Sequence, residues 1–326
     1  MSMRQVVIVG GAGFIGGHFA DRLLASPEIG GVTLYDNFSS GREWHYAHHK
    51  ADPRLSVVRG EVADLERLTD ALTGHDTVIH LASNPDIAKA MTDPTVDFHE
   101  GSALTHSVVE AARRAEVLRI LYASGSGVYG DLHEHAAKED HGPLRPVSTY
   151  GASKLAGEAL ICSYAHMFGL QGAVFRFGNV VGPRQTHGVG FDFVRRLLAD
   201  PTQLAILGDG RQSKSYIHVF DVVDAVLTVA RLAGNEPFDA YNVATGDYIT
   251  VTEIADLAVE VVGLNPDHVQ FSYSGGYRGW KGDVPIVRLD TTRINATGWR
   301  CARTSREAIR DSMAAMLDDA RAGRLT

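Results

Sequence analysis

Short apolar runs alternate with helical stretches along the first half of the chain. Apolar residues recur at helical spacing over Phe14–Ser26, Leu65–Leu72 and Ala103–Ala115. The predicted strands around these helices are Gln5–Gly10, Val32–Asp36, Leu55–Gly60, Thr77–Leu81 and Leu118–Ser124. Continuous apolar strands that alternate with helices are typical of a parallel sheet with helices on both faces. Right-handed crossovers then predict an α/β fold with a doubly wound parallel sheet, the Rossmann arrangement.

The pattern changes in the second half, where glycine- and proline-rich turns separate shorter elements. The further predicted elements are a helix over Tyr150–Phe168 ended by Gly169, a strand over Gly172–Asn179, and amphipathic helices over Val219–Arg231 and Val251–Val262. We expect a nucleotide-binding domain over residues 1–180, to which 212–235 returns. Residues 181–326 then form mainly a smaller, discontinuous α/β lobe that binds the substrate.

Composition narrows the class of partner. Glycine supplies 34 of the 326 residues, above the usual fraction of about 7%, and shows no collagen-like period. The formal net charge of −8 argues against a protein that coats nucleic acid, because phosphate binding of that kind needs a basic excess. A few local cations still suffice for one bound nucleotide.

The chain carries no sign of export or membrane insertion. Cys162 and Cys301 are too few for a disulfide framework and are interpreted as reduced thiols. The apolar stretch Val6–Gly17 is too short to span a membrane, and no cleavage-site pattern follows it. We expect a cytoplasmic protein that binds neither nucleic acid nor a membrane.

A glycine-rich turn follows the first predicted strand. Gly10, Gly13 and Gly16 stand three residues apart between that strand and the first helix. Such glycines permit a tight turn, let the backbone approach a pyrophosphate and let helix and strand pack closely. The N–H groups at the helix start face the phosphate charge. Because the trio directly follows a strand, we interpret it as a dinucleotide site.

Asp36 ends the second strand, about 20 residues further on. A carboxylate at this place accepts hydrogen bonds from the adenosine ribose and repels a 2′-phosphate, which favours NAD over NADP. Arg42 weakens the argument slightly, because an arginine can bind a 2′-phosphate.

Tyr150 and Lys154 lie four residues apart at the start of a predicted helix, so both side chains share one face. A cation beside a phenol stabilises the phenolate and lowers the phenol pKa. A phenol of that kind can act as general base on a substrate hydroxyl.

Together these motifs resemble the extended short-chain dehydrogenase/reductase family, and within it the NAD-dependent nucleotide-sugar epimerases and dehydratases. The resemblance runs in family order over nearly the whole chain. The matching segments are Gly10-Gly-Ala-Gly-Phe-Ile-Gly16, Asp36-Asn-Phe-Ser-Ser-Gly41, His80-Leu-Ala-Ser83, Val128-Tyr-Gly130, Tyr150-Gly-Ala-Ser-Lys154, Arg176-Phe-Gly-Asn-Val-Val-Gly-Pro-Arg184, Gly208-Asp-Gly210 and Lys281-Gly-Asp283.

The resemblance implies roles for individual residues of this chain. Tyr150 is expected to remove the sugar 4-hydroxyl proton, and Lys154 to bind the nicotinamide ribose. The full expected NAD-binding set is Gly10, Gly13, Phe14, Ile15, Gly16, Asp36, Asn37, Ser39, Gly41, Glu61, Val62, Leu81, Ala82, Ser83, Tyr122, Tyr150, Lys154 and Phe177. In this set, Glu61 and Val62 stand where relatives bind the adenine amino group.

The expected partner is a nucleotide-diphosphate sugar, and a homodimer is implied through the helices near Ala103–Ala115 and Tyr150–Phe168. The expected substrate-binding residues are Asn84, Lys89, Ser126, Asn179, Arg184, Thr186, His187, Lys214, Tyr216, Arg278 and Lys281, with Asp86 bordering the same pocket and Arg211 as a further cation. No metal ligand set is expected.

A catalytic serine or threonine normally lies four residues before the tyrosine of the Val-Tyr-Gly segment and bonds the sugar 4-oxygen. This chain has Gly125 at that place. Ser126 is the first candidate for the role, and Ser124 is the second.

The residues before Val128-Tyr-Gly130 also indicate which reaction to expect. The family's 4,6-dehydratases carry an Asp-Glu pair and its decarboxylases a Glu before Val-Tyr-Gly, whereas this chain has Ser126 and Gly127. Without these acids, the simplest outcome for a 4-keto sugar is to recover its hydride on the opposite face. We therefore expect an NAD-dependent nucleotide-sugar 4-epimerase, most simply of a UDP-sugar. The alternatives are an NAD(P)H-dependent 4-ketosugar reductase and a catalytically silent NAD-binding regulatory protein.

Overall fold

The computed structural model describes residues 3–84, 87–232 and 236–324. It divides into two compact units, each made of separate stretches of chain. The first unit comprises Met1–Val128, Leu144–Arg176 and Val223–Tyr241, and the second comprises Tyr129–Pro143, Phe177–Val222 and Asn242–Thr326.

A seven-stranded sheet forms the centre of the first unit, in the order β11-β6-β5-β4-β1-β2-β3. The strands are β1 (Gln5–Val9), β2 (Gly31–Asp36), β3 (Leu55–Arg59), β4 (Thr77–His80), β5 (Arg119–Gly125), β6 (Gln171–Phe177) and β11 (Phe238–Val243). The pairings of β1 with β2 and β4, of β2 with β3 and of β4 with β5 are parallel. This confirms the predicted doubly wound α/β fold.

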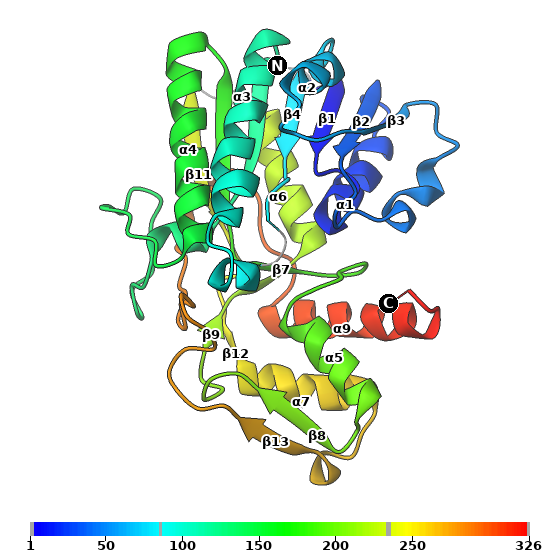
Figure 1. Ribbon diagram of the computed structural model, residues 1–326, viewed down its shortest axis with the longest axis vertical. Coiled ribbons are helices and arrows are strands. Elements are labelled where there is room, and N and C mark those ends of the chain that lie inside the picture. Colours follow the sequence, from blue (N-terminus) through cyan, green and yellow to red (C-terminus); the bar gives the residue numbers. More distant parts are fainter. Residues whose placement is uncertain (1–2, 85–86, 233–235, 325–326) are drawn as a thin grey trace. The chain divides into compact units, whose positions relative to one another are not determined.

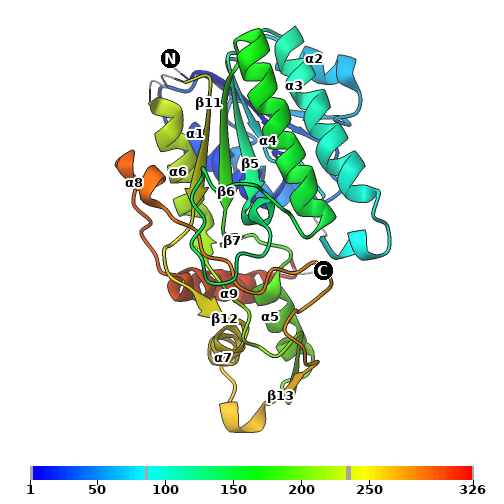
Figure 2. The same ribbon diagram turned by 90° about the vertical axis from the view of Figure 1, so that its left-hand side faces the viewer.

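Helices cover both faces of this sheet (Figures 1 and 2). The helices α2 (Leu65–Leu72), α3 (Leu104–Arg114) and α4 (Thr149–Phe168) lie on one face, and α1 (Phe14–Leu24) and α6 (Val219–Arg231) lie on the other. A buried apolar cluster that includes Val7, Leu68, Val108 and Tyr122 fills the space beneath the first face. At about 25 cal/mol per Å² of buried apolar area, burial of this kind is the main stabilising term of the unit.

The carboxyl ends of the central strands meet at one edge of the sheet, because the register is parallel. Val9 pairs with both Tyr35 and His80, and His80 pairs with Tyr122. The chain leaves β1 on one side of the sheet and β4 on the other, so this edge is a topological switch point. Open α/β sheets bind ligands at such a place.

The second unit has its own buried cluster. It contains α5 (Val189–Ala199), α7 (Val251–Val262) and α9 (Ser305–Arg321), which pack on one another, and the parallel pair β8 (Gln203–Ile206) with β13 (Gln270–Tyr273). Three short strands, β7 (Asn179–Val181), β10 (Tyr216–His218) and β9 (Ser213–Lys214), also belong to it. The remaining elements are β12 (Ile249–Thr250), α8 (Thr292–Ala296) and the short helical turns Glu43–His45, Ala47–His49, Ile87–Met91, Phe98–Ala103, Ser126–Tyr129 and Pro266–His268.

The predicted strand Gly172–Asn179 is wrong in one respect, because the structure has two strands there. Gly178 interrupts the run, and its N–H donates to the Val243 carbonyl while the N–H of Asn179 donates to the Ser215 carbonyl. β7 therefore pairs with β10 in a separate two-stranded sheet. The helices α5 and α9 were not among the predicted elements, although Thr304 and Glu307 form a capping box at the start of α9.

Within residues 3–84, 87–232 and 236–324, no helix combines the length and the apolar character that a membrane span requires.

Gly157 of α4 packs closely against Tyr122 of β5, and this contact gives a prediction on stability. A Cβ at this position would lie 2.5 Å from the Tyr122 hydroxyl and 2.8 Å from its Cζ. We expect Gly157→Ala to lower the free energy of unfolding by about 1–3 kcal/mol, because overpacking outweighs the gain of about 1 kcal/mol in helix propensity. Urea unfolding followed by circular dichroism measures this, with Ser163→Ala on the exposed face of α4 as the control. A Gly157→Ala protein as stable as the control would contradict the close packing.

Candidate active site

The glycine-rich turn lies at the carboxyl end of β1 and leads into α1. Gly10 has φ +83°, and a Cβ there would lie 2.7 Å from the amide nitrogen of Ala82, in the segment that follows β4. Gly13 is the N-cap of α1 and offers no side-chain cap. The N–H groups of the first helical turn, which have no acceptor within a helix, are thus left for an anion. A cradle that a Cβ would fill is what a bound pyrophosphate requires.

Asp36 is held rigidly at the end of β2. Its side chain is 7% exposed, Oδ2 accepts from the N–H of Ala12 at 2.9 Å, and Oδ1 accepts from the N–H of Phe38 at 2.8 Å. Burial raises the pKa of Asp36, while these two backbone bonds act in the opposite direction. A Cβ at Gly41 would lie 2.8 Å from Oδ1, so glycine is required beside the carboxylate. The carboxylate keeps further lone pairs for ribose hydroxyls.

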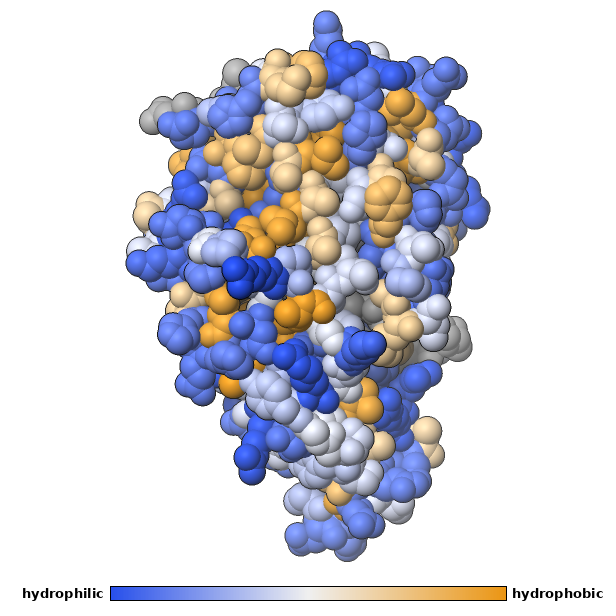
Figure 3. Space-filling model, turned by 60° about the vertical axis from the view of Figure 1, so that its left-hand side comes forward, coloured by the Kyte–Doolittle hydropathy of each residue, from blue (hydrophilic) through white to orange (hydrophobic). Residues whose placement is uncertain are grey.

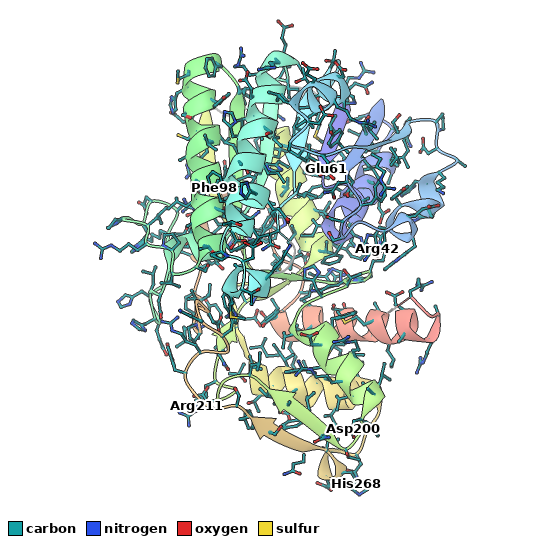
Figure 4. All side chains as sticks on the ribbon, in the orientation of Figure 1. Arg42, Glu61, Phe98, Asp200, Arg211 and His268 are labelled. Carbon is teal, nitrogen blue, oxygen red and sulfur yellow. The ribbon has the colours of Figure 1, made fainter. Side chains whose placement is uncertain are left out.

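The residues expected around the adenosine lie beside this carboxylate. Glu61 accepts a bond from Asn37 Nδ2 at 3.0 Å through its carboxylate and one from Tyr35 at 2.8 Å through its carbonyl. The N–H of Ser39 donates to Asn37 Oδ1 at 3.0 Å. Val62 is buried in the core cluster. Arg42 is exposed and donates to the Gly41 carbonyl, and Figure 4 labels both Arg42 and Glu61 in the first unit.

Lys154 is a buried cation in the first turns of α4. Its side chain is 3% exposed, its Nζ donates to the Ala123 carbonyl at 2.8 Å, and the Nζ lies 5.5 Å from the centroid of the Tyr150 ring. Burial lowers the pKa of Lys154 to about 8, and the charges of Glu158 and Asp97 oppose this shift. The lysine therefore lies beside the tyrosine on one face of α4, as the sequence spacing predicts, but the expected lowering of the Tyr150 pKa is not found, because burial raises it.

Tyr150 is partly buried, and its phenol is a weaker acid than in water. Burial raises the pKa of Tyr150 to about 12, a hydrogen bond with the Ser83 side chain lowers it, and the charge of Asp97 raises it. Ser83 is expected among the cofactor residues, and the structure brings it to the phenol of Tyr150. A hydroxyl that donates to the phenolate favours the charged form of a general base.

Buried polar residues pack against the Tyr150–Lys154 pair. His80 is fully buried, its Nε2 lies 3.1 Å from Thr105 Oγ1, and burial lowers its pKa to about 3, so the ring is neutral. Tyr122 is 1% exposed, and its ring lies 5.1 Å from Lys154 Nζ. Tyr122 thus belongs to the core and packs under the lysine, and its expected contact with the cofactor stays a prediction.

The serine positions before Val128 differ sharply from one another. Ser124 is buried, and its hydroxyl donates to Glu158 Oε1 at 2.5 Å. The same carboxylate receives Arg176 Nη2 at 2.7 Å, which makes a buried ion pair. Ser124 is thus committed to this network, which favours Ser126, half-buried at the start of the following helical turn. A Cβ at Gly125 would meet no atom within 4 Å.

The other expected site residues of the first unit differ in burial. Phe14 is buried, Ile15, Leu81 and Ala82 are half-buried, and a Cβ at Gly16 would lie 2.6 Å from the Gly11 carbonyl oxygen. Asn84 is buried and donates to Asp97, whereas Lys89 is exposed. Asp86 lies outside the described residues.

The second unit brings together two expected substrate residues. Asn179 opens β7, and its side chain is hydrogen-bonded to that of Tyr216, which is 7% exposed in β10. Burial raises the pKa of Tyr216, so it stays a neutral phenol. Phe177 is buried at the end of β6. Arg184, with φ +67°, and Thr186 are half-buried, and His187 is exposed.

The expected diphosphate cations of the second unit are largely paired with acids. Lys214 Nζ donates to the buried Asp283 at 2.6 Å, and Arg278 donates to Asp131 at 2.6 Å and to the Asp283 carbonyl. Lys281 and Arg211 are exposed, and Arg211 lies at the periphery of this unit in Figure 4.

Three residues of the site were not predicted from the sequence. Glu158 follows Lys154 by four residues, so the helical spacing alone could have shown it on the same face. Asp97 carries no motif, and its contact with Thr149, Oγ1 to Oδ2 at 2.6 Å, joins residues 52 apart in the chain. Arg176 is paired with Glu158 through a similar long-range contact.

Comparisons with known proteins show the family of this chain. The family model described as NAD dependent epimerase/dehydratase family matches residues 6–244. A UDP-glucose 4-epimerase of Mycolicibacterium smegmatis is 33% identical over 304 residues, which cover 91% of this chain and 93% of that protein. A dTDP-glucose 4,6-dehydratase of Actinoplanes sp. is 31% identical and covers 82% of this chain and 84% of that protein.

Solved structures give the same result. A crystal structure of a UDP-galactose 4-epimerase has a TM-score of 0.84 and 34% identity, and it covers 97% of this chain and 99% of that one. A UDP-glucose 4-epimerase of Thermus thermophilus in complex with NAD has a TM-score of 0.83 and 30% identity, covering 96% of this chain and 99% of that one. The family resemblance and the expectation of NAD as cofactor are confirmed.

The Asp36 carboxylate is expected to select NAD. We expect Asp36→Ala to weaken NAD binding about 10- to 100-fold, because hydrogen bonds to a charged group are worth about 1.5–3 kcal/mol. NADP binding should weaken less, since the same carboxylate repels a 2′-phosphate. Calorimetric titration of nucleotide-free protein measures both affinities, with Asp70→Ala on the exposed face of α2 as the control. Unchanged NAD affinity in Asp36→Ala would contradict the assignment.

Proposed function

Because the chain belongs to the NAD-dependent epimerase/dehydratase family, we propose that it is a nucleotide-sugar 4-epimerase whose substrate is a UDP-sugar. The observation that carries the proposal is the Tyr150–Lys154 pair beside a segment without acids. A Cβ at Gly151 would lie 2.6 Å from the Gly127 carbonyl oxygen, so residues 125–127 border the helix turn that carries Tyr150. The 4-epimerases among the relatives support the same substrate class.

Each residue has a defined part in the reaction. Bound NAD supplies the hydride acceptor and later the hydride donor. The phenolate of Tyr150 takes the proton of the sugar 4-hydroxyl and returns it at the end of the cycle. The ammonium of Lys154 stabilises that phenolate and donates to the nicotinamide ribose. The Gly10–Gly16 turn and Asp36 hold the pyrophosphate and the adenosine ribose.

The neighbouring segment determines what happens to the 4-keto sugar. Elimination of water needs a further acid or base beside the ring, whereas Ser126 and Gly127 provide neither. The 4-keto sugar then has one productive outcome, return of the hydride. A return to the opposite face inverts C4. Ser126 is proposed to donate a hydrogen bond to the sugar 4-oxygen, where charge changes during the reaction.

Substrate binding by the second unit is proposed from its paired polar residues. Asn179 and Tyr216 are proposed to contact the diphosphate and the base, with Arg184, Thr186 and His187 near the sugar. Lys214 and Arg278 would neutralise the diphosphate while their acidic partners hold them in place. Lys281 is an exposed cation that can add to this charge.

A homodimer is also proposed, by analogy with the family. Exposed apolar side chains occur at Met167 and Phe168, at the end of α4, and at Phe98 before α3. Figure 3 shows hydrophobic side chains interspersed with hydrophilic ones on the side of the first unit where α4 lies. An interface through α3 and α4 would cover these residues.

The first experiment is a panel of UDP- and dTDP-sugars incubated with the purified protein. We expect one pair of C4 epimers to interconvert, with no net consumption of added NADH or NADPH, because the hydride returns to the sugar. Tyr150→Phe should lower kcat by about 10²–10⁴. Nuclear magnetic resonance of the sugar products measures the reaction. Stoichiometric loss of NAD(P)H would instead show a 4-ketosugar reductase, and equal behaviour of Tyr150→Phe and wild type would show a protein without this chemistry.

The position of the hydroxyl donor is a separate prediction. We expect Ser126→Ala to lower kcat about 10- to 100-fold, the loss of one hydrogen bond to a charged oxygen. Adding Gly125→Ser to Ser126→Ala should restore part of it, because the space beside Gly125 admits the side chain. Ser124→Ala should chiefly lower the free energy of unfolding, since its hydroxyl belongs to the Glu158 network. If Ser124→Ala abolishes turnover without loss of stability while Ser126→Ala has no effect, the order of the two candidates is reversed.

A further inference from the structure

Asp97 is a buried carboxylate at the entrance to the helical turn Phe98–Ala103, and it is 2% exposed. Its Oδ1 accepts a hydrogen bond from Asn84 Nδ2 at 2.9 Å. Its Oδ2 accepts a second from Thr149 Oγ1 at 2.6 Å. One partner lies in the segment after β4, and the other is the first residue of α4. The carboxylate thus ties two distant stretches of the first unit together.

The two partners adjoin the reactive pair. Asn84 directly follows Ser83, whose side chain is hydrogen-bonded to Tyr150, and Thr149 directly precedes Tyr150. A fixed Asn84 leaves the Ser83 hydroxyl little freedom, and a fixed Thr149 limits the helix turn that carries the phenol. The same carboxylate therefore holds both partners of the Ser83–Tyr150 hydrogen bond.

The charge of Asp97 acts on the phenol and on the ammonium together. It raises the pKa of Tyr150, after the larger effect of burial, and it raises that of Lys154 against the effect of burial. Glu158 acts on Lys154 in the same direction and is itself paired with Arg176. Among the described residues, Asp97 is the acid that acts on both groups.

Of the other titratable groups near the pair, Glu158 is ion-paired with Arg176, whereas His80 and Tyr122 are neutral around pH 7. His80 lies near Lys154 and is kept unprotonated by burial, which lowers its pKa to about 3. Burial raises the pKa of Tyr122, whose ring lies under the Lys154 ammonium. Asp97 is therefore the group whose charge can shift both titrations together without a change in the protonation of its neighbours.

We propose that Asp97 is a positioning residue of the Tyr150–Lys154 pair, which holds the Ser83 hydroxyl against the phenol and sets the pH range of proton exchange. This rests on the proposed function, because the proton exchanged is that of the substrate hydroxyl. A buried carboxylate costs several kcal/mol unless its surroundings compensate for it. Two neutral donors and the nearby ammonium supply that compensation here.

The test separates the charge from the hydrogen bonds. Asp97→Asn keeps the shape, since the amide oxygen accepts from Asn84 and the amide nitrogen donates to the Thr149 hydroxyl. Loss of the negative charge lowers the pKa of Tyr150, which must be deprotonated, and that of Lys154, which must be protonated. Both limbs of the pH profile of kcat should therefore move to lower pH, by about one unit. Asp93→Asn, an exposed acid in the same segment, should leave the profile unchanged.

A second variant should shift the pH profile in the opposite direction. Ser83→Ala removes a hydrogen bond that lowers the pKa of Tyr150, so only the limb that follows Tyr150 should move, and to higher pH. A merely structural role of Asp97 would lower stability or activity and leave both limbs in place, which would overturn the proposal. A shift of either limb to higher pH in Asp97→Asn would overturn it as well.

A direct titration of Tyr150 tests the role of Asp97 without a measurement of turnover. Nuclear magnetic resonance of the NAD-bound protein labelled at tyrosine Cζ follows the ionisation of Tyr150, assigned by the Tyr150→Phe variant. We expect Asp97→Asn to lower the measured pKa whether or not a nucleotide sugar is converted. A lowered pKa without any conversion would reject the proposed function and keep the role of Asp97, whereas an unchanged pKa would reject the role.

Discussion

The ammonium of Lys154 lies in the interior of the first unit, where burial disfavours its charged form. The groups around it compensate for this loss of hydration. A buried lysine without partners would lose its proton. The Ala123 carbonyl accepts one hydrogen bond from Nζ, and the ring faces of Tyr122 and Tyr150 lie within 5.5 Å. Cation–π contacts of this kind are worth more when they are desolvated. The charge is thereby retained close to the phenol that needs it.

The acids around this lysine divide between two tasks. Glu158 is neutralised by Arg176 and receives the Ser124 hydroxyl, so its carboxylate belongs to a closed network in the core. Asp97 accepts hydrogen bonds from neutral donors, and its charge acts on both Tyr150 and Lys154. A paired acid gives the helix a fixed position, whereas an unpaired one also sets the electrostatic potential at the reactive atoms. The two roles need different partners, which explains why the chain uses two acids within the same core.

The sequence predicts those parts of the site that local spacing encodes. The Gly10–Gly16 turn, Asp36 at the end of β2 and the Tyr150–Lys154 pair each follow from the position of a residue within one strand or helix. The contacts of Tyr122 and Asp97 cannot be predicted in this way, because they join residues far apart in the chain. An apolar pattern cannot distinguish a tyrosine that faces a cofactor from one that packs beneath a lysine. The break of the predicted strand at Gly178 has the same cause, since its partners Val243 and Ser215 lie far along the chain.

In the second unit, acidic groups hold cations in fixed positions. Lys214 is paired with the buried Asp283, and the neighbouring Arg278 is paired with Asp131 and with the Asp283 carbonyl. A cation so paired gives up part of its attraction for an anionic ligand, but it loses less conformational freedom when the ligand binds. The position of the Lys214 ammonium therefore depends on the buried carboxylate of Asp283, which accepts its hydrogen bond at 2.6 Å.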